Sequence, residues 1–192
     1  GRKKELSEEI GWIESRRGDM LGFWSKVEEG TIPTRVTHND TKINNILFDR
    51  QGEVLCAIDL DTVMASTSLN DFGDAIRSYA NTGDEDDRDL SRVGLSLEMF
   101  RAYTEGYLSQ RAKQLTDSEI DHLAFSARYI TFEQVLRFLM DYIDGDTYYK
   151  IKYPGHNLVR THAQYRLLQS MEEHYGEMCR IVRETVDKYR KA

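Results

Sequence analysis

This chain has few cysteines and prolines and no excess of positive charge, and each of these features limits what the protein can be. Only Cys56 and Cys179 occur among 192 residues, which is too few for a disulfide framework or a zinc site, so we expect a reducing compartment. Twenty-six basic residues face 33 acidic ones, giving a net charge of -7, which disfavours nucleic acid and anionic membranes as partners. No apolar stretch is long enough to span a bilayer, and the charged opening GRKKELSEE is unlike a signal peptide, so we expect a cytoplasmic protein.

The spacing of apolar residues predicts one mostly helical unit with a single small β element. Only two prolines are present, so long helices are expected over 4–28, broken near Gly18, and then near 71–80, 88–109, 116–143 and 158–189. ILF (46–48) and VLCAID (54–59), joined by a turn at 49–52, predict a hairpin of buried strands. The predicted fold class is therefore α+β, predominantly α-helical, with residues 1–192 as one domain.

Two further patterns are interpreted as structural. The stripe Phe125, Tyr129, Phe132, Leu136 and Leu139 has helical spacing and is expected in the core. The acidic run 84–89 lacks the Gly that a calcium loop needs at its sixth position, so a solvated loop with a helix cap is expected.

The stretch THNDTKINNILF (37–48) carries the candidate chemistry. His38-x-Asp40-x4-Asn45 precedes the hairpin, which returns the chain at Asp59 beside the other two residues. Phosphoryl transfer needs a carboxylate that orients the acceptor hydroxyl and accepts its proton, and oxygen ligands for the Mg²⁺ on ATP. We expect Asp40 in the first role and Asn45 and Asp59 in the second. The alternative is that Asp40 and Asn45 only cap a turn.

Two residues beside the proposed base have different expected roles. Lys42 can place an ammonium near the transferring phosphoryl group, where negative charge is spread over three oxygens. We expect His38 to hold the catalytic loop by hydrogen bonds, because the neighbouring carboxylate is better placed to act as the base.

THNDTKINNILFD and AIDLDTVMASTSLNDFGDAIR resemble the catalytic core of the aminoglycoside phosphotransferase and choline kinase superfamily, relatives of protein kinases. RVTHNDTKINN, IDLDTVM and RFLMDYIDGDTYYK are most similar to the bacterial N-acetylhexosamine 1-kinases, over essentially the whole chain. The resemblance implies the C-terminal lobe of a protein-kinase-like fold with a small catalytic hairpin. It also implies ATP as co-substrate, Mg²⁺ as cofactor and a small-molecule sugar or alcohol as acceptor.

The same resemblance suggests roles for further residues. Asp59 takes the metal-binding role with Asp61 as a second ligand, whereas Asp71, although it begins a DFG triplet, opens a helix and braces the catalytic loop. The purely structural interpretation, which is compatible with this role, is that Asp71 is a helix N-cap. Arg137 and Tyr148 contact the acetamido sugar, with Lys42 and Ile43 nearby. Arg137 and Tyr148 could instead be surface ion-pair or packing residues.

The nucleotide-binding half of such a kinase has no counterpart in this sequence. There is no GxGxxG, no P-loop and no strand lysine ahead of the catalytic turn, and the first residue is Gly1 rather than Met. We therefore expect a C-terminal lobe whose N-terminal lobe, which helps to hold the nucleotide, is missing. Such a piece is expected to fold and to transfer phosphate poorly or not at all.

The expected activity is phosphorylation of the anomeric C1 hydroxyl of N-acetylglucosamine or N-acetylgalactosamine. Choline, an aminoglycoside, homoserine or another small alcohol as acceptor is the first alternative. A choline site would need an aromatic cage with acidic groups, and an aminoglycoside site a broad acidic surface. A non-catalytic pseudokinase or binding module is the second alternative.

Overall fold

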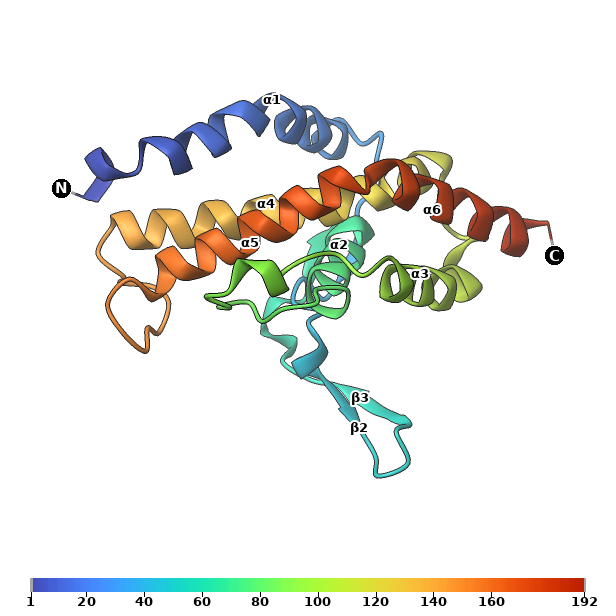
Figure 1. Cartoon of the computed structure of the whole chain (residues 1–192). Coiled ribbons are helices and arrows are strands. Elements are labelled where there is room, and N and C mark those ends of the chain that lie inside the picture. Colours follow the sequence, from blue (N-terminus) through green and yellow to red (C-terminus); the bar gives the residue numbers. More distant parts are fainter. Residues whose placement is uncertain (1, 192) are drawn as a thin grey trace.

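The computed structural model describes residues 2–191, so Gly1 lies outside the described residues. Long helices form the body of the molecule, with α4 packed between α2 and α5 and with α3 packed on α6 (Figure 1). The predicted α+β class with predominant helix is confirmed. The α-helices are α1 (Ser7–Glu28), α2 (Ser68–Tyr79), α3 (Leu97–Arg111), α4 (Asp117–Ile143), α5 (His156–Glu173) and α6 (Tyr175–Arg190). Short 3₁₀ helices are η1 (Arg2–Glu5), η2 (Ile43–Asn45), η3 (Leu60–Thr62) and η4 (Leu90–Arg92).

Local capping residues explain where the central helices begin. The Thr116 side chain accepts from the backbone N–H of Glu119, and the Glu119 side chain accepts from that of Thr116, so a capping box starts α4. Thr67 caps α2 by accepting from Leu69 N–H. The expectation that Asp71 caps this helix is therefore wrong. Asp71 lies inside the helix, which leaves its carboxylate free to bond elsewhere.

Three of the predicted helix boundaries need correction. Residues 7–28 form one unbroken helix through Gly18, where an added Cβ would meet nothing within 4 Å. The segment predicted over 88–109 begins as a helix only at Leu97, because Ser96 provides the N-cap. The segment predicted over 158–189 is two helices that meet at His174.

The two structural patterns have different outcomes. In the aromatic stripe on α4, Phe132 and Leu139 are buried, and Phe125 and Tyr129 are partly buried against the core. The acidic run is a loop in which Asp89 caps η4 by accepting from Ser91 N–H. The largest fully buried apolar side chains are Phe72, Phe100, Ile32, Leu69, Ile76, Leu108, Leu123, Leu167, Leu168, Met171, Met178 and Ile181.

A glycine sets the close approach of α2 to α4. A Cβ added at Gly73 would lie 2.4 Å from the carbonyl oxygen of Ser126 and 2.9 Å from Cγ1 of Ile130. Backbone atoms of a helix cannot move aside as a flexible side chain can. The DFG triplet therefore serves packing at two of its positions, because Phe72 is fully buried and Gly73 allows the contact.

Two small antiparallel sheets lead into and out of the catalytic loop. Strand β1 (Arg35–Thr37) pairs with β4 (Met64–Ser66), a sheet that the sequence analysis did not predict because each strand has only three residues. Strand β2 (Ile46–Phe48) pairs with β3 (Val54–Ala57) with Ile46 opposite Ala57, and this is the predicted hairpin. Gly52 occupies the turn with a φ of 86°, a value that favours glycine.

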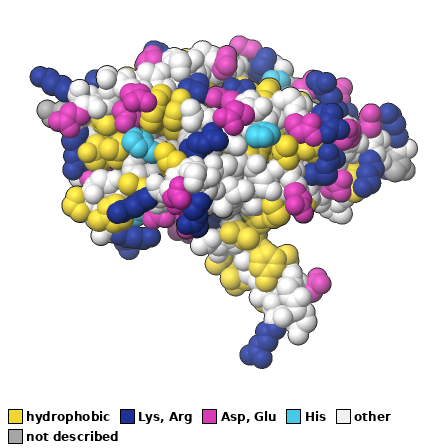
Figure 2. Space-filling model, viewed as in Figure 1, with side chains coloured by type: hydrophobic (Ala, Val, Ile, Leu, Met, Phe, Trp, Pro, Cys, Tyr) yellow, Lys and Arg dark blue, Asp and Glu magenta, His cyan; other side chains and the backbone are white. Residues whose placement is uncertain are grey.

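The expectation that the hairpin strands are buried is wrong. The hairpin projects from the helical body (Figure 1), and Val54 and Leu55 are each 63% exposed. Figure 2 shows hydrophobic side chains along the part of this projection nearest the body. The apolar pattern reports a preference for burial, but no element within residues 2–191 covers these strands.

No described helix is long and apolar enough to cross a bilayer.

Candidate active site

Asp71 of α2 contacts the loop between β1 and η2 through both its side chain and its carbonyl group. The Asp71 carboxylate accepts from His38 N–H at 3.0 Å and from Asn39 N–H at 2.7 Å. The Thr41 hydroxyl donates to the Asp71 carbonyl at 2.7 Å. Asn39 has a left-handed φ of 61°, which asparagine tolerates better than most residues. These bonds fix the backbone on both sides of Asp40.

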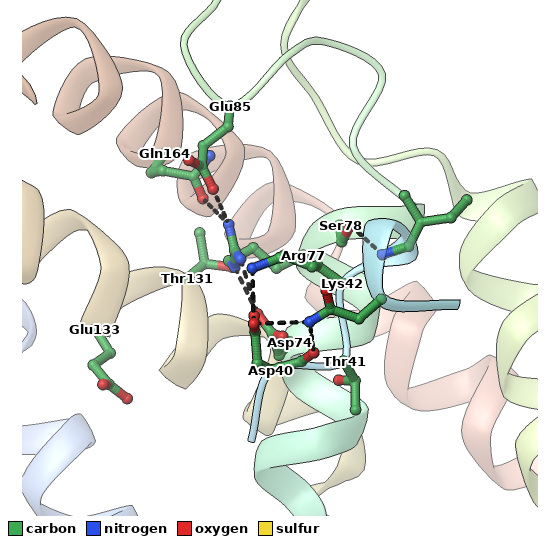
Figure 3. Close-up of polar contacts among 12 residues, drawn as sticks. Asp40, Thr41, Lys42, Asp74, Arg77, Ser78, Glu85, Thr131, Glu133 and Gln164 are labelled. Atoms are coloured by element: carbon green, nitrogen blue, oxygen red, sulfur yellow. Dashed lines mark hydrogen bonds and ion pairs between the residues drawn. The ribbon is translucent and has the colours of Figure 1, made fainter. Parts of the chain in front are cut away.

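The Asp40 carboxylate is oriented by two donors. Its Oδ2 accepts from Lys42 Nζ at 2.7 Å and from Asn45 Nδ2 at 2.8 Å. The same Asn45 amide nitrogen donates to the Asp40 carbonyl at 2.8 Å. Figure 3 shows Lys42 bonded to Asp40. The structure therefore brings Asp40, Lys42 and Asn45 into direct contact, with Asn45 buried.

His38 joins the catalytic loop to the end of the hairpin. Its Nε2 lies 2.9 Å from the carbonyl oxygen of Ile58. A carbonyl can only accept, so Nε2 carries the proton. The Thr62 hydroxyl also donates to the His38 carbonyl at 2.6 Å. His38 thus holds the chain segment that leads directly to Asp59.

The proposed metal ligands lie at the base of the hairpin. Ile58 N–H donates to the Asn45 carbonyl at 2.9 Å, which places Asp59 one residue from a direct contact with Asn45. Asp59 has a left-handed φ of 63°, and both Asp59 and Asp61 are exposed. The predicted strand end at Asp59 is wrong by two residues, because β3 ends at Ala57.

The donor chemistry of these residues fits a magnesium ion. Asn45 uses its amide nitrogen on Asp40, so its Oδ1 keeps its lone pairs, and the Asp59 carboxylate accepts no hydrogen bond from residues 2–191. Within that range no three His, Cys, Asp or Glu side chains gather into a group that could hold a metal by themselves. Mg²⁺ is commonly bound through one or two protein oxygens together with substrate phosphates and water, so one amide and one carboxylate are a suitable set.

A cleft of about 710 Å³ opens beside Asp40. Five of the predicted site residues line this cleft, namely Asp40, Lys42, Ile43, Arg137 and Tyr148. His38, Asn45, Asp59, Asp61 and Asp71 do not line it. The loop that carries Asp40 and the acceptor-residue candidates Arg137 and Tyr148 therefore share one space, and the metal-ligand candidates lie outside it.

A buried carboxylate shapes the wall of the cleft that carries Tyr148. Asp141 accepts hydrogen bonds from the backbone N–H groups of Thr147, Tyr148 and Tyr149 and from the Asn157 amide. Burial alone would raise the pKa of Asp141, but these donors outweigh it and lower that pKa. Asp141 is therefore a clamp for this loop.

Every aromatic ring that lines the cleft faces a guanidinium group. Arg137 lies 5.9 Å from the ring centre of Tyr148 and 5.6 Å from that of Tyr149. Arg160 lies 5.3 Å from the ring centre of Phe138. These distances are typical of cation–π contacts. Positive charge is thus already present at the ring faces.

The sequence analysis missed three buried polar residues of the cleft: Asp74, Arg77 and Gln164. Arg77 donates to Asp74 through Nε at 3.0 Å and Nη2 at 2.9 Å, and through Nη1 to Gln164 at 3.4 Å. The signal on α2 was the three-residue spacing of Asp71, Asp74 and Arg77, which places them along one side of the helix. No comparable signal marks Gln164, because it lies 87 positions beyond Arg77 and meets it only through helix packing.

A helical lobe with an Asp–Lys–Asn loop beside a projecting hairpin and a polar cleft is the arrangement expected of a kinase-like phosphotransferase. The model of the phosphotransferase enzyme family (APH) matches residues 3–112, which is more than half of the chain. The chain therefore belongs to this family, within the aminoglycoside phosphotransferase superfamily. The match includes Asp40, Asp71 and Asp74, and it ends before Arg137 and Tyr148.

Proposed function

We propose that this protein transfers the γ-phosphoryl group of ATP to the anomeric hydroxyl of N-acetylglucosamine or N-acetylgalactosamine in the cytoplasm. The observation that supports the proposal most is the position of Asp40. It lines a cleft large enough for a sugar, on a loop whose backbone is held by Asp71. Family membership supports phosphoryl transfer to a small molecule, and the choice of acceptor rests on the cleft.

In the proposed reaction Asp40 orients the acceptor hydroxyl and takes its proton. The hydroxyl oxygen forms a bond to the γ-phosphorus, the bond from that phosphorus to the β–γ bridging oxygen breaks, and ADP leaves with that oxygen. Lys42, which pairs with Asp40 at 2.7 Å, offsets the negative charge on the transferring group. Most of the acceleration then comes from positioning and electrostatics, as is general for phosphoryl transfer.

Asn45 and Asp59 would hold the magnesium ion, with Asp61 as a further candidate. The ion would supply neutralisation of the phosphate charges. What this chain contributes is the orientation of the two oxygen ligands. Asn45 is buried and bonded to Asp40, and Asp59 follows a residue whose N–H bonds to Asn45. The proton acceptor and the proposed ligands are thereby linked through one short network.

The cation–π contacts at the aromatic faces of the cleft disfavour choline as the acceptor. Choline recognition needs open aromatic faces, and here the faces of Phe138, Tyr148 and Tyr149 meet Arg137 or Arg160. A bound cation would be repelled by these guanidinium groups. Polar groups of both signs line the remaining walls, which suits hydroxyl and amide groups.

We also propose that a second, nucleotide-binding lobe covers the hairpin in the working enzyme. The exposed apolar side chains of this region are Val36, Leu47, Phe48, Val54, Leu55, Ile58, Leu60, Val63 and Met64. A contiguous apolar surface of this kind is typical of a face that meets another protein segment. The 192-residue chain alone, given Mg-ATP and N-acetylglucosamine, is expected to show little or no turnover. Robust turnover by this chain alone would refute this part of the proposal.

The test of the function uses the full-length protein with Mg-ATP and a panel of N-acetylhexosamines, choline, homoserine and aminoglycosides. A phosphorus NMR signal from an anomeric phosphate is the expected product. Asp40→Asn is expected to lower turnover at least about a hundredfold, in the range for loss of a positioned proton acceptor. Asp121→Asn, an exposed carboxylate of α4 that does not line the cleft, is the matched control and should retain activity.

The outcomes separate the alternatives. Phosphorylation of choline or an aminoglycoside in preference to a sugar would overturn the acceptor assignment. No transfer to any alcohol, together with retained folding, would favour the pseudokinase. Unchanged turnover in Asp40→Asn would remove the proposed base from the reaction.

A further inference from the structure

Three side chains that line the cleft each carry a buried polar atom without a hydrogen-bond partner among residues 2–191. These atoms are Oδ2 of Asp74, Nε2 of Gln164 and the hydroxyl of Tyr149. Asp74 is 6% exposed and Gln164 is 1% exposed. Burial raises the pKa of Tyr149, so its hydroxyl keeps its proton and can donate. Buried polar groups are normally paired, so three such atoms on residues that line one cleft require an explanation.

Arg77 explains why these particular atoms are free. Its Nε and Nη2 donate to Oδ1 of Asp74, and its Nη1 donates to Oε1 of Gln164. Arg77 is itself buried. Its Nη1 donates at 2.9 Å to Glu85, which lies in the loop after α2 (Figure 3). One oxygen of Asp74 and the amide nitrogen of Gln164 are therefore left for another partner, on side chains that can no longer rotate freely.

We infer that Asp74 and Gln164 form a binding subsite for a second polar group of the acceptor, a hydroxyl or a secondary amide. The inference rests on the proposed function, since the acceptor must already place one hydroxyl at Asp40. Oδ2 of Asp74 accepts a hydrogen bond, and Nε2 of Gln164 donates one. A hydroxyl can donate to the first atom or accept from the second, and a secondary amide offers one donor and one acceptor. The Tyr149 hydroxyl, in the loop after α4, adds a further donor.

The hydrogen bonds of the subsite limit which group can bind there. Asp74 and Glu85 both pair with Arg77. Asp74 uses only its Oδ1 in that pair, so its Oδ2 can accept from a hydroxyl or an amide. A buried donor and a buried acceptor discriminate strongly against an analogue that lacks the matching group, because these atoms are then left unpaired.

The test measures coupling between each residue and each acceptor group. Titration calorimetry and initial-rate kinetics would be run on the full-length protein with N-acetylglucosamine and its 3-, 4- and 6-deoxy analogues and its 2-deoxy analogue lacking the acetamido group. Asp74→Asn and Gln164→Glu, which exchange acceptor for donor and donor for acceptor, are each expected to weaken binding and raise KM at least tenfold. The kcat should change less than threefold.

One analogue should bind tenfold more weakly than N-acetylglucosamine to the unaltered protein. The Asp74→Asn variant should bind that analogue and N-acetylglucosamine with equal affinity. Asp121→Asn serves as the control and should change neither binding nor KM. Gln164→Glu lies on α5, so it provides an independent test if Asp74→Asn fails to fold. The subsite would be overturned if a folded variant bound N-acetylglucosamine as tightly as the unaltered protein. It would also be overturned if each analogue lost the same affinity, relative to N-acetylglucosamine, in the variants as in the unaltered protein.

The two proposals fail in different ways. Asp40→Asn should bind N-acetylglucosamine and lose turnover, whereas Asp74→Asn should lose binding and keep kcat. Loss of phosphorylation with preserved coupling to Asp74 would reject the kinase and keep the subsite. Phosphorylation of the sugar with no coupling to Asp74 or Gln164 would reject the subsite and keep the kinase.

Discussion

Glu119 offers the sharpest test of how the catalytic loop is joined to the helical body. Its carboxylate is fully buried and accepts from Arg35 Nε at 2.6 Å and Nη2 at 2.7 Å. The Ser68 hydroxyl at 2.8 Å and the Thr116 N–H at 2.8 Å complete its shell. One side chain thereby connects β1, the start of α2 and the start of α4.

The contribution of Glu119 follows from its protonation. Burial alone would raise its pKa, but Arg35, the Thr116 N–H and Ser68 together lower the pKa from 4.5 to about 2. That drop corresponds to about 3 kcal/mol of folding free energy carried by the charged form. Because the folded-state pKa lies below the unfolded one, the contribution is complete above about pH 4.5 and is lost as pH falls towards about 2.

Glu119→Gln is therefore expected to lower the free energy of unfolding by about 3 kcal/mol at pH 7 and by about half of that at pH 3. Urea denaturation followed by circular dichroism at pH 7, 5, 4 and 3 would measure both values. Glu98→Gln, an exposed glutamate in the first turn of α3, is the control and should change stability by less than about 1 kcal/mol. A Glu119→Gln penalty that does not shrink between pH 5 and pH 3 would refute the reasoning.

Three smaller changes test other features of the fold. Gly73→Ala should cost at least about 2 kcal/mol in thermal unfolding, because the new Cβ would meet the Ser126 carbonyl, whereas Gly18→Ala should be neutral or stabilising. Asp141→Asn should speed hydrogen exchange of the three loop amides that this carboxylate binds, and unchanged exchange would contradict its role as a clamp. Thr116→Ala should lower the free energy of unfolding by about 1 kcal/mol through loss of the capping box. An unchanged urea midpoint would contradict this role of Thr116.

The parts of the fold predicted from sequence are those encoded by residues close together in the chain. The hairpin was predicted because its turn residues and strand residues are neighbours, and the α4 start was predicted to within a residue because Thr116 and Glu119 are three positions apart. The start of α3 was misplaced because apolar spacing before Ser96 resembled a helix. Local spacing alone does not reveal that this helix begins only after Ser96.

Burial and the acceptor cleft could not be predicted in the same way. The hairpin strands are apolar and yet exposed, because burial depends on what packs against them. Asp40 was recognised from its neighbours, whereas Asp74 and Gln164 lie 90 positions apart and meet through Arg77. Such a pair is visible only once α2 and α5 are placed against each other.

In the proposed complex, helix α2 would fix the spacing between the loop that carries Asp40 and the subsite at Asp74. Asp71 holds the loop that carries Asp40, and Asp74 lies one turn further along, a rise of about 4.5 Å. Since α2 is pressed against α4 at Gly73, this separation can stretch very little. An acceptor of the wrong size would then lose contact with either Asp40 or Asp74, so the proposed enzyme would select its substrate by length.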